Sequence, residues 1–79
     1  MTINRIYNPS QGTSFIVDAQ LAFTEIYLVS RNGMVYNVLQ PGNEGIVGGL
    51  YVAYLPSMGR INFDTPFELN ETVNIIFEI

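Results

Sequence analysis

The sequence predicts an all-β fold, either a small antiparallel β-sandwich or a partly open barrel of six to seven short strands. Runs of strand-favouring residues alternate with turn residues at near-regular intervals along the 79 residues. One run, residues 25–31, and another, residues 34–39, flank Asn32-Gly33, the dipeptide typical of a type I′ hairpin turn. The chain is also 48% hydrophobic and only 13% charged, which demands extensive burial. No long linker or charge block divides it, so residues 1–79 are expected to form a single domain.

The expected strands follow from alternation and turn chemistry. They cover residues 2–7, 13–19, 24–31, 34–39, 50–55, 60–64 and 71–79. The residues between them are rich in Pro, Gly, Asn and Ser. These favour turns because Pro fixes φ, Gly is conformationally free, and Asn and Ser form local hydrogen bonds. Gly59 closes one such turn, and the pair Gly48-Gly49 indicates a bulge or a close backbone approach. Residues 20–23 are too short for a stable helix, so we expect a loop or single turn with Leu21 and Phe23 directed inward.

The hairpin around Asn32-Gly33 has apolar side chains on both of its predicted faces. Strict alternation places Ile26 and Leu28 on one face and Tyr27 and Val29 on the other. An antiparallel strand that is exposed on one side alternates more cleanly than this. The hairpin is therefore expected to be covered on both sides, or to meet a partner with its outer face, because large exposed apolar patches are rare on soluble monomers.

Composition excludes several classes of function. The chain has no Cys and no His, so thiolate sites, disulfides and the commonest general base and metal ligand are ruled out. Its three basic residues and net charge of −4 argue against nucleic-acid binding. No apolar run approaches the ~20 residues that span a bilayer, and no signal peptide opens the chain, so no membrane association is expected.

Candidate chemistry among the remaining residues is weak. The seven carboxylates are not paired as a glycosidase requires, and the serines lack a basic partner. The loose cluster of Asp64, Glu68 and Glu71 is the nearest approach to a calcium site, but its spacing differs from that of an EF-hand loop. The glycines of residues 42–49 lack the Lys-Ser/Thr ending of a phosphate loop. We therefore expect no catalytic residue, no metal, no cofactor and no enzymatic activity.

The order of motifs resembles the small β-domains of bacteriophage virion proteins, of the tail-fibre and head-accessory type. The resemblance extends from about Gln11 to the end of the chain. It is carried by Gly12-Thr13-Ser14-Phe15, Glu25 to Gly33, Tyr51 to Tyr54, Gly59 to Phe63 and Asn70 to Phe77. Two departures are the long glycine-rich segment 41–49 and the apolar character of residues 20–23.

The resemblance implies a virion structural protein, made in the host cytoplasm, that acts by multi-copy assembly as a decoration, fibre-attachment or connector subunit. The expected partners are further copies of this chain and other virion proteins. The residues expected at the assembly interface are Tyr27, Val29, Tyr36, Val38 and Ile76, beside the structural turn residues Asn32, Gly33 and Gly59.

The alternative is a carbohydrate-binding module that recognises glycans on the host surface. The five tyrosines are compatible with a protein interface and with glycan binding, because tyrosine combines a large contact area with a polar tip. A glycan site requires an exposed aromatic pair with polar neighbours, and Tyr27 and Tyr51 are its candidates.

Overall fold

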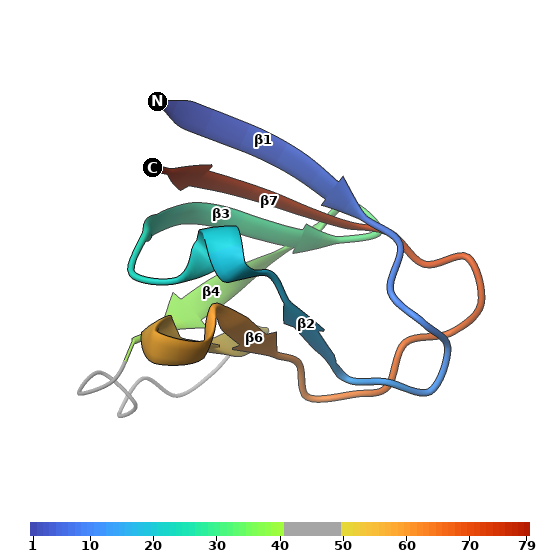
Figure 1. Ribbon diagram of the computed structural model, residues 1–79. Helices are drawn as coiled ribbons and strands as arrows, with labels where there is room; N and C mark the ends of the chain where they lie inside the picture. The colour runs from blue at the N-terminus through green and yellow to red at the C-terminus, as the bar shows by residue number, and fades with distance from the viewer. Residues whose placement is uncertain (41–49) are drawn as a thin grey trace.

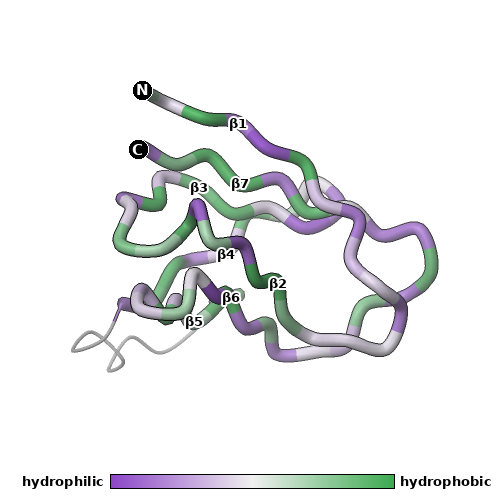
Figure 2. The backbone as a smooth tube through the Cα atoms, in the orientation of Figure 1, coloured by the Kyte–Doolittle hydropathy of each residue, from purple (hydrophilic) through white to green (hydrophobic). Residues whose placement is uncertain are grey.

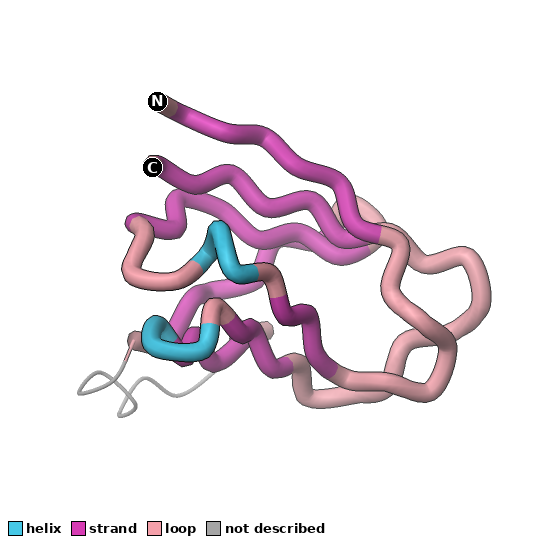
Figure 3. Tube along the Cα trace, viewed as in Figure 1, coloured by secondary structure: helices cyan, strands magenta, loops and turns pink. Residues whose placement is uncertain are grey.

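A computed structural model describes residues 1–40 and 50–79 and shows one curled sheet of seven strands that forms a half-barrel (Figure 1). The strands are β1 (Thr2–Tyr7), β2 (Phe15–Val17), β3 (Glu25–Arg31), β4 (Met34–Leu39), β5 (Tyr51–Leu55), β6 (Arg60–Asn62) and β7 (Val73–Glu78). Two 3₁₀-helices, η1 (Ala19–Leu21) and η2 (Pro56–Met58), are the only helical turns in the described part of the chain (Figure 3). The predicted all-β class and partly open barrel are confirmed.

The sheet has the order β1-β7-β3-β4-β5-β6-β2 and is antiparallel except at one place. The first half of β4 pairs with β3, and its second half pairs in parallel with β5, Asn37 opposite Tyr51. The sheet therefore bends at β4, and its two halves face each other across the core (Figure 1). The predicted glycine-rich loop and Gly48-Gly49 bulge lie outside the described residues.

The β3–β4 hairpin turns at Asn32-Gly33, as the sequence predicted. Arg31 pairs with Met34, and both turn residues have positive φ, 51° at Asn32 and 84° at Gly33. This is the backbone geometry that a two-residue type I′ turn requires. Asn32 is also tied to the neighbouring segment, because its side-chain oxygen accepts a hydrogen bond of 3.0 Å from Thr72 N.

A β-bulge at Tyr27 changes which residues of β3 face the core. The register against β7 shifts between Ile26 and Leu28, so that Tyr27 is left without a partner residue. One extra residue reverses the alternation. Ile26 points inward before the bulge, and Val29 points inward after it, fully buried. The expectation that Tyr27 and Val29 share an outer face is therefore wrong.

The core lies on the concave side of the sheet. Val73, Ile75 and Phe77 of β7 face it together, as predicted, and so do Ile61 and Phe63. Tyr36 is also buried there, with its ring 5.6 Å from that of Phe63 in an edge-to-face arrangement. The other buried core residues are Ile16, Leu21, Ile26, Val29, Val52, Tyr54 and Phe67.

Arg31 anchors the connector between β6 and β7 to the sheet. Its guanidinium is buried and donates to Glu71, to both oxygens of Thr65 at 2.8 and 3.0 Å, and to Pro66 O at 2.8 Å. The same group lies 4.7 Å from the centre of the Phe67 ring. Of the two apolar anchors expected in this connector, Phe67 is buried and Leu69 is 70% exposed.

Candidate functional site

The residues predicted for an assembly interface are divided by the structure between the core and the surface. Val29 and Tyr36 are buried, so neither is available to a partner, and Val38 packs against the core. Tyr27 is 51% exposed, and Ile76 is half-buried on the convex side of β7. The physical reason is the bulge at Tyr27, which residue spacing alone does not predict.

A convex apolar surface nevertheless covers the half of the sheet made by β1, β7, β3 and β4. We define this outer face by the side chains that point away from the core: Ile6, Tyr27, Leu28, Val35 and Ile76. Pairing places Ile76 beside Leu28, and the flanking Ile6 and Val35 are 66% and 62% exposed. In Figure 2 the strands that carry these residues alternate green, apolar segments with purple, hydrophilic ones.

Polar groups lie between the apolar residues of the outer face. Asn74 of β7 pairs with Ile6 on one side and with Ser30 on the other, and Ser30 pairs with Val35. The side-chain oxygen of Asn74 is buried and has no hydrogen-bond partner among the described residues. An acceptor left in this state costs on the order of 1–3 kcal/mol, so this row of the sheet contains one unsatisfied polar group.

The two edge strands, β1 and β2, leave a gap in the barrel that we call the seam. Asp18, which follows β2, bridges it: its carboxylate accepts hydrogen bonds from Arg5 at 2.9 Å and from Tyr7 at 2.8 Å. The same carboxylate caps η1 by accepting from Gln20 N at 2.9 Å. One side chain therefore fixes both β1 and η1 across the open side of the half-barrel.

Hydrogen bonding sets the charge state of the seam. Burial by itself would raise the pKa of Asp18, but the bonds from Gln20, Tyr7 and Arg5 outweigh it and the pKa lies below its ordinary value of 3.8. Burial, followed by the bond to Asp18, raises the pKa of Tyr7 far above its ordinary value of 10.0. The phenol thus stays protonated and the carboxylate stays charged at neutral pH, which is a structural pairing rather than an acid–base one.

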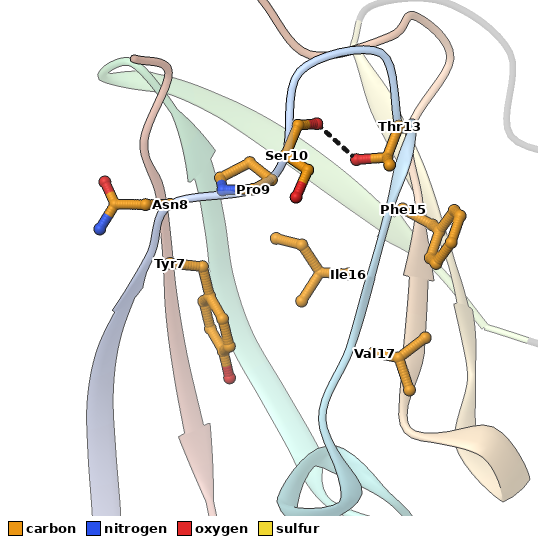
Figure 4. A pocket seen from close by; sticks show the side chains of 8 residues that line it. All are labelled: Tyr7, Asn8, Pro9, Ser10, Thr13, Phe15, Ile16 and Val17. Carbon is orange, nitrogen blue, oxygen red and sulfur yellow. Dashed lines mark hydrogen bonds between the residues drawn. The ribbon is translucent and has the colours of Figure 1, made fainter. Parts of the chain in front are cut away.

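A pocket of about 280 Å³ opens beside the seam, at the end of β1 (Figure 4). Its floor is Ile16, which is buried and points toward the ring of Tyr7 in Figure 4, while Phe15 and Val17 point away. The full lining is Tyr7, Asn8, Pro9, Ser10, Thr13, Phe15, Ile16 and Val17. The loop that frames it is held by Thr13, whose hydroxyl donates to Ser10 O at 2.7 Å. We call this hollow the seam pocket.

Phe23, expected to point inward, is instead 78% exposed between η1 and β3. Its φ of 55° lies in the left-handed region, where a bulky residue costs roughly 1–2 kcal/mol. Hydrogen bonds hold the backbone there, from Phe23 N to Pro56 O at 3.2 Å and from Thr24 N to the Tyr54 hydroxyl at 3.1 Å. The buried Tyr54 hydroxyl also donates to Leu21 O. Leu21 alone fills the core position that the sequence assigned to both residues.

The acidic residues form no ligand set in the described ranges, 1–40 and 50–79, where no group of three His, Cys, Asp or Glu side chains could hold a metal ion. Of the loose predicted cluster, Glu71 is bound to Arg31, and this bond lowers its pKa below the ordinary value of 4.5. No helix in that part of the chain is long and apolar enough to cross a membrane.

Comparison with known proteins gives no relative: no family model, no curated protein and no solved structure matches this chain. The features that remain for a functional argument are the outer face, the seam pocket and the exposed Phe23. Sequence reasoning located parts of the first and missed the other two. The only signal for the seam pocket was the turn chemistry of residues 8–12, and the apolar residues 20–23 were the only signal for Phe23.

Proposed function

We propose that this protein is a structural subunit of a bacteriophage particle, a head, neck or tail accessory that acts by assembling in many copies. The observation that carries the proposal is the outer face. A chain of this size has one core, and that core is already filled on the concave side of the sheet. The convex side leaves Ile6 and Val35 more than half exposed on regular, paired stretches of β1 and β4, and Tyr27 is 51% exposed at the bulge of β3.

A rigid apolar surface of this kind suits association better than catalysis. Burial of apolar area stabilises a complex by roughly 25 cal/mol per Å², and a preformed sheet loses little conformational entropy when it binds. The acidic side chains beside this face, Glu25 of β3 and Glu78 of β7, lie opposite each other at one end of it, and Glu78 is paired with the N-terminal ammonium group. The virion assignment is supported by the ordered motif resemblance, and the assembly assignment by this surface.

The test is self-association of a variant in which the outer face is made polar without loss of strand propensity. Ile6→Thr with Val35→Thr keeps β-branched side chains at two exposed positions. We expect sedimentation velocity to show association at least tenfold weaker than for the unaltered chain, with a similar melting temperature. Met34→Thr is the matched control, since Met34 is 54% exposed but precedes Val35 and points to the other side of the strand.

An unaltered chain that stays monomeric at high concentration, and is absent from purified particles by mass spectrometry, would overturn the proposal. If the double variant and the unaltered chain associate equally well, the outer face is not the surface through which copies associate.

Glycan binding is the second candidate, because Tyr27 and Tyr51 are both exposed and both lie on the convex side. The Phe15 ring is less suited to stacking, since Arg60 already lies 4.0 Å from its centre. A glycan array distinguishes the two functions: glycan binding requires a signal that Tyr27→Ala or Tyr51→Ala abolishes, whereas a purely structural subunit gives none.

A further inference from the structure

The exposed Phe23 and the seam pocket form a complementary pair at opposite ends of the molecule. Phe23 N donates to the carbonyl oxygen of Pro56, the first residue of η2. Met58, two residues later in η2, is 52% exposed at the same end of the molecule. We call Phe23 and Met58 the apolar tip. The seam pocket lies at the far end of β1, next to Tyr7 (Figures 1 and 4).

The separation of the two features follows from the strand register. Glu25, two residues after Phe23, pairs with Glu78, which in turn pairs with Thr2 at the start of β1. Tyr7 stands five residues further along β1, which at ~3.3 Å per residue is roughly 17 Å away. Since Phe23 N is also tied to Pro56 O, the ring of Phe23 cannot enter the pocket of its own molecule.

Size decides what the pocket can hold. A cavity of ~150 Å³ lined by apolar groups accepts benzene, and the seam pocket is about 280 Å³. Small-molecule sites usually begin at about 300 Å³ and enclose their ligand, whereas this pocket is open on one side, with Ser10 and Asn8 exposed at its rim. An apolar floor at Ile16 and a polar rim match one aromatic side chain presented by another protein.

We propose that the apolar tip of one copy inserts Phe23 into the seam pocket of a second copy, so that copies associate head to tail. This inference rests on the proposed function and adds a second contact between copies to the one through the outer face. A contact between two different surfaces leaves one tip and one pocket free at the ends of every chain of copies. It therefore builds rings or open filaments rather than closed two-fold dimers.

The conformation of Phe23 supports an anchoring role. Hydrogen bonds at Phe23 N and Thr24 N hold the backbone at positive φ and so fix the direction in which the Phe23 side chain leaves the chain. Such preorganisation lowers the entropy lost on binding, and buried aromatic side chains at the centre of an interface are common hot spots. Strain of this kind persists where the surroundings impose it and often marks functional positions.

The experiment uses two variants that each disable one partner. Phe23→Asn removes the ring while keeping a residue that tolerates positive φ. Ser10→Trp fills the pocket from its rim, where Ser10 is exposed and its side chain points toward Ile16 in Figure 4. Each variant alone is expected to associate at least tenfold more weakly than the unaltered chain in sedimentation velocity, and Met34→Asn serves as an exposed apolar control.

Mixing the two variants gives the decisive result, with Ile6→Thr and Val35→Thr added to both chains to remove contact through the outer face. Phe23→Asn retains a pocket and Ser10→Trp retains a tip, so an equimolar mixture should form a one-to-one complex that stops at two chains of 8.9 kDa each in native mass spectrometry. Circular dichroism of each variant verifies folding, and Phe23→Gly replaces Phe23→Asn if the latter fails to fold.

Two results would overturn the inference and are distinguishable from each other. If the unaltered chain associates and Phe23→Asn associates equally well, or the mixture forms no complex, the tip–pocket contact is refuted while assembly through another surface stands. If the unaltered chain is monomeric in solution and absent from particles, the proposed function fails together with the contact.

Discussion

The two halves of the half-barrel are held together in different ways. β7 pairs with β1 and with β3 through six residue pairs on each side, so two long antiparallel ladders fix that half. β2 and β6 have three residues each, and their half depends on specific bonds to the 3₁₀-helices. The Tyr54 hydroxyl and the Asp18 carboxylate supply several of these bonds. The first half should therefore tolerate change at its turns better than the second.

The glycines of the two turns make this contrast concrete. Gly33 (φ 84°) and Gly59 (φ 58°) both have left-handed backbone. A Cβ on Gly33 would meet nothing within 4 Å, whereas one on Gly59 would overlap the Asp18 carbonyl oxygen and lie 3.1 Å from Ala22 N. The turn at Gly33 protrudes into solvent, and Gly59 lies where η1 and η2 approach each other.

The largest expected effect is that of Gly59→Ala. Backbone overlap and positive φ together should lower the free energy of unfolding by roughly 4 kcal/mol. Gly33→Ala, with the same change in side chain, adds conformational strain only and should cost about 1 kcal/mol. Urea denaturation of both variants measures the difference, and equal losses would show that the two halves do not differ in this way.

The next largest effect concerns the link between the first half and the β6–β7 connector. Arg31→Met leaves Glu71 unpaired and removes the bonds to Thr65 and Pro66. Because both partners of this ion pair are about nine-tenths buried, we expect a loss of roughly 3 kcal/mol.

A double-mutant cycle sharpens this prediction. Glu71→Gln in the Arg31→Met background should cost little further, since the charge that lost its partner is removed. Limited proteolysis should cut residues 64–72 faster in Arg31→Met than in the unaltered chain. Purely additive losses would indicate that Arg31 acts through its packing against Phe67 alone.

The smallest effect is expected at the seam, and it depends on pH. Asp18→Ala removes the cap of η1 and the bridge to β1, at a cost of about 1 kcal/mol near pH 7. The folded-state pKa of Asp18 is lowered, so its stabilisation is complete above the ordinary value of 3.8 and is lost as the pH falls through the lowered value. Thermal melts of both proteins should therefore converge in acid. A gap between them that persists below pH 2 would contradict the assigned role of the carboxylate.

Local sequence patterns predict most of the strands because strand and turn formation there depends on residues that are close together in the chain. Thr2–Tyr7 and Met34–Leu39 coincide with β1 and β4, and the turn lies at Asn32-Gly33. Positive φ at Asn and Gly is a property of those residues themselves, so the sequence predicts it without tertiary information. The inward face of β7 followed from strict alternation in the same way.

The errors arose where a non-local constraint overrode a local pattern. The bulge at Tyr27 follows from how β3 matches β7, and it moved Val29 into the core. Phe23 lost its expected core position because Leu21, two residues earlier, fills that space and the backbone is bound to Pro56 and Tyr54. Neither Val29 nor Phe23 lies in a local sequence pattern that distinguishes a buried position from an exposed one.

The sequence by itself determined the all-β class, the hairpin turn and an excess of apolar residues over what one small core can hold, because composition and period-two alternation are encoded residue by residue. The tertiary structure alone decided which apolar residues stay outside. Strand order brings Ile6 of β1 level with Val35 of β4, leaves the seam between β1 and β2 open, and directs Phe23 into solvent. Those placements depend on contacts between segments far apart in the chain, which no local pattern records.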